Sequence, residues 1–222
     1  MHVKSALLLA GTILAGLTVA AQAQPIPVIW DFSQPTGNIG PTHTYDSTPT
    51  GGGTITATGY NSDGSTHDLF GKHEGDSENG LGLAGTPDNE IIAGTFVQLN
   101  ISNLSVPPLS STTLSFAANS VQSSSSDEWA VYGTNTAGTL SGATLIETGT
   151  DQNTHDLANV IGTYKFLDVT EVNPSPANIL ITELDNSITT STPVPEPASL
   201  ILLGTALVGL GLVRRRRSTP SA

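Results

Sequence analysis

Apolar and polar residues alternate in short runs from residue 24 to about residue 186, and Gly, Asn, Ser and Pro separate the runs. Alternation with a period of two is typical of a strand with one buried face. No window carries apolar residues at the i, i+3, i+4, i+7 spacing of a surface helix. The pattern predicts strands at residues 28–32, 54–60, 68–70, 96–101, 113–117, 128–132, 143–147, 164–169 and 178–184. We therefore expect residues 24–186 to form an all-β domain, a single β-sandwich of jelly-roll type.

The aromatic residues divide into expected core residues and candidate ligand contacts. Trp30 and Trp129 lie inside predicted strands, and the alternation favours burial of both rings. Sugar binding needs an exposed aromatic ring that stacks on the sugar. Tyr45 and Tyr60 lie beside predicted turns, so they are the candidate ligand residues.

The N-terminal residues 1–23 have the three parts of a secretory signal peptide. Lys4 lies in a basic first part, residues 6–20 are apolar, and Ala21-Gln22-Ala23 fits an A-x-A cleavage site. We expect cleavage after Ala23, so that the exported chain begins at Gln24. The alternative is an uncleaved membrane anchor, against which the short apolar part argues.

A second apolar segment, residues 198–213, contains 16 residues without a charge. As a helix it would be about 24 Å long, slightly less than a hydrocarbon core of about 30 Å. The segment is followed by four arginines, which the positive-inside rule retains in the cytoplasm: Arg214, Arg215, Arg216 and Arg217. The pattern predicts a transmembrane helix that leaves the middle of the chain outside the cell, as the signal peptide also does.

The residues before this helix are Val194-Pro195-Glu196-Pro197, preceded by a polar linker at residues 187–193. The Val-Pro-Glu-Pro motif, apolar helix and arginine cluster resemble the PEP-CTERM sorting signal over residues 194–217, with residues 218–222 as a tail. The resemblance implies processing near Pro-Glu-Pro by exosortase, a membrane-associated protease. It also implies transient anchoring in the membrane, then release or transfer to the surface of an exopolysaccharide-producing bacterium. An ordinary single-pass anchor is the alternative.

Acidic residues dominate the expected exported domain. The whole chain has 7 basic and 19 acidic residues and a formal charge of -12. Without its two ends the chain keeps 18 acids against two bases, Lys72 and Lys165, for a charge of -16. Such a surface repels phosphate groups, which excludes nucleic acid as a partner. The chain has no cysteine, which excludes disulfides and thiolate metal sites.

The densest acidic patch, residues 72–80 with residues 88–90, is a candidate calcium site. Calcium takes six to eight oxygen ligands, and glycine-rich loops let several oxygens converge. The candidate ligands of a structural calcium ion are Glu74, Asp76, Glu78, Asn79, Asp88 and Glu90. A pair of solvated acidic loops without a metal is the alternative. The same region loosely resembles uncharacterised ectodomains that accompany this sorting tail, which implies only a β-sandwich fold.

Catalytic motifs are absent from the sequence. The histidines lack H-E-x-x-H spacing, no G-x-S-x-G elbow occurs, and the many carboxylates have no defined separation. We expect a non-enzymatic, exopolysaccharide- or biofilm-associated component of the cell surface or extracellular matrix. The alternative is a calcium-dependent carbohydrate-binding module.

Overall fold

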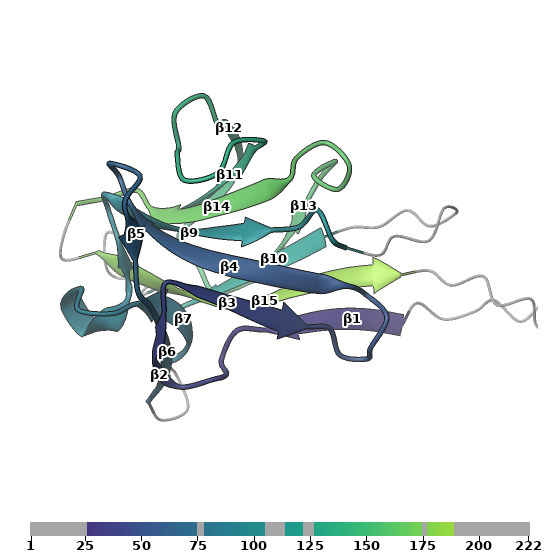
Figure 1. The fold of residues 1–222 in the computed structure, drawn as a ribbon, viewed down its shortest axis with the longest axis horizontal. Helices are drawn as coiled ribbons and strands as arrows, with labels where there is room; N and C mark the ends of the chain where they lie inside the picture. Colours follow the sequence, from purple (N-terminus) through teal and green to yellow (C-terminus); the bar gives the residue numbers. More distant parts are fainter. Residues whose placement is uncertain (1–25, 75–77, 105–113, 122–126, 175–176, 189–222) are drawn as a thin grey trace, which may run out of the picture. The chain divides into compact units, whose positions relative to one another are not determined.

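The computed structural model of the chain describes residues 26–74, 78–104, 114–121, 127–174 and 177–188. The expected signal peptide and the sorting segment, residues 1–23 and 194–217, lie outside these ranges. All strands of the described residues pair antiparallel and form two sheets (Figure 1). The prediction of an all-β fold is therefore confirmed.

The first sheet has eight strands, and its central member is β15 (Asn178–Ile188). The order along the sheet is β13 (Thr154–Leu157), β10 (Leu114–Asn119), β15, β7 (Glu78–Leu83), β6 (Leu69–Glu74) and β2 (Gly37–Gly40). In addition, β1 (Ile26–Asp31) and β8 (Ile91–Ile92) pair with β15. The first and the last described strands are thus hydrogen-bonded to each other.

The second sheet has seven strands. Its order is β12 (Thr144–Gly149), β11 (Trp129–Thr134), β14 (Phe166–Glu171), β9 (Thr95–Asn100), β4 (Thr54–Asn61) and β3 (Thr42–Asp46), while β5 (Thr66–His67) pairs with β4. Burial alternates along β4, where Ile55 and Ala57 are fully buried and the residues between them are partly exposed. This alternation is what the sequence predicts for a sheet with one covered face.

Each of the nine predicted strands overlaps a strand of the structure, but the described residues form six more: β2, β3, β5, β7, β8 and β13. The most consequential of these is β7, Glu-Asn-Gly-Leu-Gly-Leu, because its first residues belong to the acidic patch for which the sequence predicts glycine-rich loops. Its glycines have a packing role instead. A Cβ on Gly82 would lie 2.1 Å from the backbone oxygen of Asn89, so only glycine allows this close approach.

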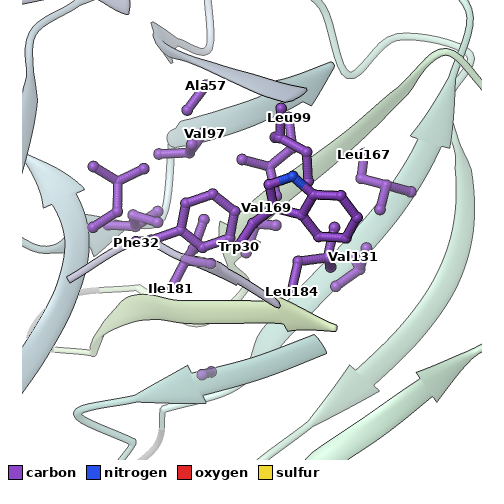
Figure 2. Close-up of a cluster of buried hydrophobic side chains, with 14 of the residues drawn as sticks. Trp30, Phe32, Ala57, Val97, Leu99, Val131, Leu167, Val169, Ile181 and Leu184 are labelled. Carbon is purple, nitrogen blue, oxygen red and sulfur yellow. The ribbon is translucent and has the colours of Figure 1, made fainter. Parts of the chain in front are cut away.

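The hydrophobic core contains buried side chains from both sheets (Figure 2). Trp30 of β1 lies among Val97 and Leu99 of β9 and Leu184 of β15. Its indole Nε1 donates a hydrogen bond to the backbone oxygen of Gly53, 3.1 Å away, so the one polar atom of the ring is satisfied. Trp129 is equally buried, and the expectation that both tryptophans face the core is confirmed.

Trp30→Ala tests how much this core contributes to the stability of the domain. Because the ring is fully buried, we expect the free energy of unfolding to fall by about 3–5 kcal/mol, measured by urea denaturation. The control is Leu145→Ala, since Leu145 is 52% exposed and its truncation should cost less than about 0.5 kcal/mol. Similar losses in the two variants would contradict the central position of Trp30.

Candidate functional site

The residues behind the export and sorting predictions fall outside the described ranges. They are Ala21, Ala23 and Gln24 at the expected signal cleavage site, and Val194, Pro195, Glu196, Pro197, Arg214, Arg215, Arg216 and Arg217 in the C-terminal segment. Within the described ranges no helix is long and apolar enough to span a membrane. The apolar segment at residues 198–213 lies outside these ranges.

The candidate calcium ligands lie on a β-hairpin and on the segment that follows it. Glu74 ends β6 and faces Glu78 at the start of β7, and the backbone oxygen of Asn79 accepts a hydrogen bond from Asn119 Nδ2. Asp88 belongs to a short 3-10 turn, Pro87–Asn89, and Asp76 lies outside the described ranges. Among the described residues no three His, Asp or Glu side chains gather where they can hold a metal ion. The calcium site stays a prediction.

Two of these carboxylates bind a lysine. Lys72 Nζ lies 2.6 Å from Glu78 Oε2 and 2.6 Å from Glu90 Oε1, and Ser120 Oγ donates to the same Glu90 oxygen over 3.0 Å. These four residues, the Lys72 cluster, join β6, β7, the segment after the 3-10 turn and the end of β10. Lys72 and Glu90 are almost fully buried. The cluster therefore links separate segments through charge-assisted hydrogen bonds.

Burial and pairing act against each other in the Lys72 cluster. Burial alone would lower the pKa of the Lys72 ammonium, but the hydrogen bonds and negative charges of Glu78 and Glu90 raise this pKa above its usual value. Lys72 is therefore a cation at all physiological pH values. Burial raises the pKa of the Glu90 carboxyl, although the hydrogen bonds from Lys72 and Ser120 and the charge of Lys72 act in the opposite direction. Sequence analysis missed this pairing, although Lys72 is one of only two bases in the expected domain.

The two candidate sugar-stacking tyrosines have different environments. Tyr45 is only 5% exposed and packs edge-on against Phe32, with 4.8 Å between ring centroids. Burial raises the pKa of its phenol above the usual value, and the nearby charge of Asp31 adds to this. The prediction of a sugar platform at Tyr45 is wrong, because β3 places this side chain on the inner face, opposite Ile55.

Tyr60 is half-buried at the end of β4. Its ring stacks on Phe96 with a centroid distance of 5.2 Å and an interplanar angle of 22°. It continues the outer face of the second sheet, on which Thr42 and Thr44 of β3 lie beside Thr58 and Thr56 of β4. The hydroxyl oxygens of Thr44 and Thr56 are 3.0 Å apart, and those of Thr42 and Thr58 are 3.4 Å apart. We call these four residues the threonine face.

A buried carboxylic acid lies farther along the same outer face. Asp168 of β14 is the Cα partner of Gln98 of β9, and its Oδ1 accepts a hydrogen bond of 2.7 Å from Gln98 Nε2. Asp168 is fully buried, and burial raises its pKa to about 7, although the bond from Gln98 acts in the opposite direction. Sequence analysis missed this group. The only signal was an acid placed between two core positions, Leu167 and Val169.

Two histidines of the described residues have polar partners in the structure. His155 Nε2 lies 2.8 Å from Asp151 Oδ1, and the imidazole packs edge-on against Trp129. His67 contacts Asn61 Oδ1 and the backbone oxygen of Ala84 through its two ring nitrogens. Both residues lie in short strands, β13 and β5.

Comparison with known proteins identifies one segment of the chain. Residues 193–217 match the family model of the PEP-CTERM protein-sorting motif. This chain carries a PEP-CTERM sorting motif. The motif implies export, anchoring in the membrane and exosortase-dependent sorting to the surface. No curated protein and no solved structure matches the chain, so these comparisons assign no function to the β domain that precedes the PEP-CTERM motif.

Lys72→Met tests the Lys72 cluster. The substitution leaves Glu90 buried without its counter-charge, so we expect the free energy of unfolding to fall by about 3–5 kcal/mol in urea denaturation. Lys165→Met is the matched control, because Lys165 is the other base of this domain and is exposed. It should change stability by less than about 0.5 kcal/mol.

In the double variant Lys72→Met/Glu90→Gln no buried charge remains on this pair, and much of the loss should be recovered. Equal losses in the two lysine variants would contradict this account.

Proposed function

We propose that the chain is a non-catalytic component of the cell surface or extracellular matrix, exported and then sorted by exosortase. The observation that carries this proposal is the sorting motif at residues 193–217. The acidic character of the preceding domain supports an extracellular role, because a charge of -16 favours solubility and discourages adhesion to nucleic acid and anionic lipid. In this role the β domain is the part delivered, and the C-terminal segment is its sorting signal.

Intact-mass analysis of the protein from its native host tests the sorting step. We expect an N-terminus at Gln24 and a C-terminus near Pro195, with the apolar segment and the four arginines removed. Replacing Glu196 by Ala should leave the chain at full length in the membrane fraction, since it alters the Pro-Glu-Pro motif. Lys165→Met, far from the motif in sequence, should be processed normally. A wild-type protein that retains its arginines at the surface would refute the proposal.

A carbohydrate-binding role is the second candidate, and the threonine face favours it. Thr42, Thr44, Thr56 and Thr58 present hydroxyl groups on adjacent strands, and Tyr60 continues the row along β4. No residue of this set is charged, although the domain as a whole is strongly acidic. Neutral polysaccharide suits such a surface, because hydroxyl groups can exchange hydrogen bonds with it without a charge being desolvated. Calcium at the predicted ligands would be a separate, structural requirement of this module; these ligands are Glu74, Asp76, Glu78, Asn79, Asp88 and Glu90.

Affinity electrophoresis in gels containing the host exopolysaccharide tests this second candidate. Thr44→Asp/Thr56→Asp adds two charges to the threonine face and should abolish retardation by the polymer. Thr144→Asp/Thr148→Asp adds the same charge to exposed positions of β12, at the opposite edge of this sheet, and should leave retardation unchanged. Repeating the wild-type measurement with a calcium chelator separates the metal requirement from sugar binding. Equal effects of the two double variants would exclude a specific contact at the threonine face.

A further inference from the structure

The connection between β11 and β12 crosses the outer face of the second sheet. We call residues 135–142 of this connection the strap. The backbone N–H of Gly138 donates to Gln98 Oε1 over 3.2 Å, and Gln98 Nε2 approaches the backbone oxygen of Thr136 at 3.4 Å. A Cβ on Gly138 would lie 3.2 Å from the Tyr60 ring. The strap thus reaches from β11 past β14 and β9 to Tyr60, near the end of strand β4.

A single side-chain amide joins the strap to the buried acid. Gln98 uses Oε1 for the strap and Nε2 for Asp168, whose Oδ1 is 2.7 Å away. The other carboxyl oxygen of Asp168, Oδ2, is buried and has no hydrogen-bond partner among the described residues. Gln98 therefore contacts both the strap and the buried acid.

The surroundings of Asp168 do not compensate a negative charge. Its neighbour on β9 is the neutral amide of Gln98, and its neighbour on β11 is Tyr132, so neither of these two strands places a cation beside it. On β4, beyond Gln98, lie Thr58 and Tyr60, and the strap sequence Asn-Thr-Ala-Gly-Thr-Leu-Ser-Gly contains no charged residue. An ionised carboxylate at this place gains stability only when water reaches it.

We propose that Asp168 is a pH-responsive latch for the strap: the neutral acid keeps residues 135–142 closed over the sheet, and its ionisation releases them. Opening hydrates the carboxylate through the gap left above Gln98. It also uncovers the stacked rings of Tyr60 and Phe96, which continue the row of the threonine face along β4. The latch is independent of the sorting proposal, since it rests only on contacts within the β domain.

The direction of the effect follows from linkage. Closed, Asp168 has a pKa of about 7, whereas a hydrated aspartate has a pKa of about 4. The closed form therefore binds the proton more tightly. The free-energy preference for the closed form over the open form is complete at low pH and declines as the pH rises from about 4 through 7. The gap between these two values limits the increase of the open population to roughly a thousandfold.

Hydrogen exchange of the full-length chain, followed by mass spectrometry between pH 5 and pH 9, tests the latch. The Gly138 amide reports strap opening, because its acceptor is Gln98. After correction for the intrinsic pH dependence of exchange, we expect its protection in the wild type to fall at least tenfold as the pH rises through 7. In Asp168→Asn the corrected protection should be independent of pH. Glu183→Gln, which removes a partly buried acid from the other sheet, should behave as the wild type does at Gly138.

A pair of glycine variants keeps the proposal testable if Asp168→Asn does not fold. Gly138 and Gly142 both have positive φ, at 72° and 77°, but only a Cβ at Gly138 would contact Tyr60. Gly138→Ala should therefore loosen the strap more than Gly142→Ala does, and should shift the Asp168 titration, followed by carboxyl carbon NMR, to lower pH. A corrected Gly138 protection that is constant with pH in the wild type would overturn the proposal. So would an Asp168 titration that is identical in the two glycine variants.

Discussion

Burial of the inner faces of the two sheets is the interaction on which the rest of the structure depends, because the chain has no cysteine and no disulfide can restrain the domain. Trp30, Phe32 and Trp129 supply the largest buried side chains of this core. β15 completes it, since it carries buried apolar residues and pairs with β1, β7, β8 and β10. The polar surfaces on the outside, including the threonine face, keep their geometry only while this core stays packed.

The scarcity of bases determines how the interior accommodates its acids. Lys72 is bound to Glu78 and Glu90, and Lys165, the other lysine of the expected domain, is exposed. The remaining buried acids depend on neutral donors. Asp168 accepts from the Gln98 amide, and Glu171 accepts from the backbone N–H groups of Glu128 and Asn173. Neutral donors stabilise a carboxylate less than a cation does.

The sequence was sufficient for those features that repeat along the chain. Alternation located nine strands and the burial of Trp30 and Trp129, because each apolar position contributes independently to one sheet face. It failed at β7 and β3, where glycine, threonine and histidine replace the usual apolar residues and pairing with a neighbouring strand decides the structure. Because the alternation does not predict β3, it places Tyr45 beside a turn on the surface, whereas the side chain lies on the inner face. Contacts such as Lys72 with Glu90 and Asp168 with Gln98 join residues 18 and 70 positions apart, and no local pattern encodes them.

The buried acids together give the β domain a preference for mildly acidic conditions. Burial raises the pKa of Glu171, Glu183 and Asp185 above its usual value, as it does for Asp168. Each of these groups holds its proton more tightly in the folded state, so its contribution to stability declines as the pH rises above about 4.

Asp63 and Asp151 act in the opposite direction: hydrogen bonds from Ser65 and His155 lower their pKa values, and the resulting stability is lost as the pH falls below about 4. Asp63 is exposed and Asp151 is partly exposed, so solvent screens their contribution. Repulsion among 18 acids also increases as they ionise, and the stability of the domain is therefore greatest on the acidic side of neutrality.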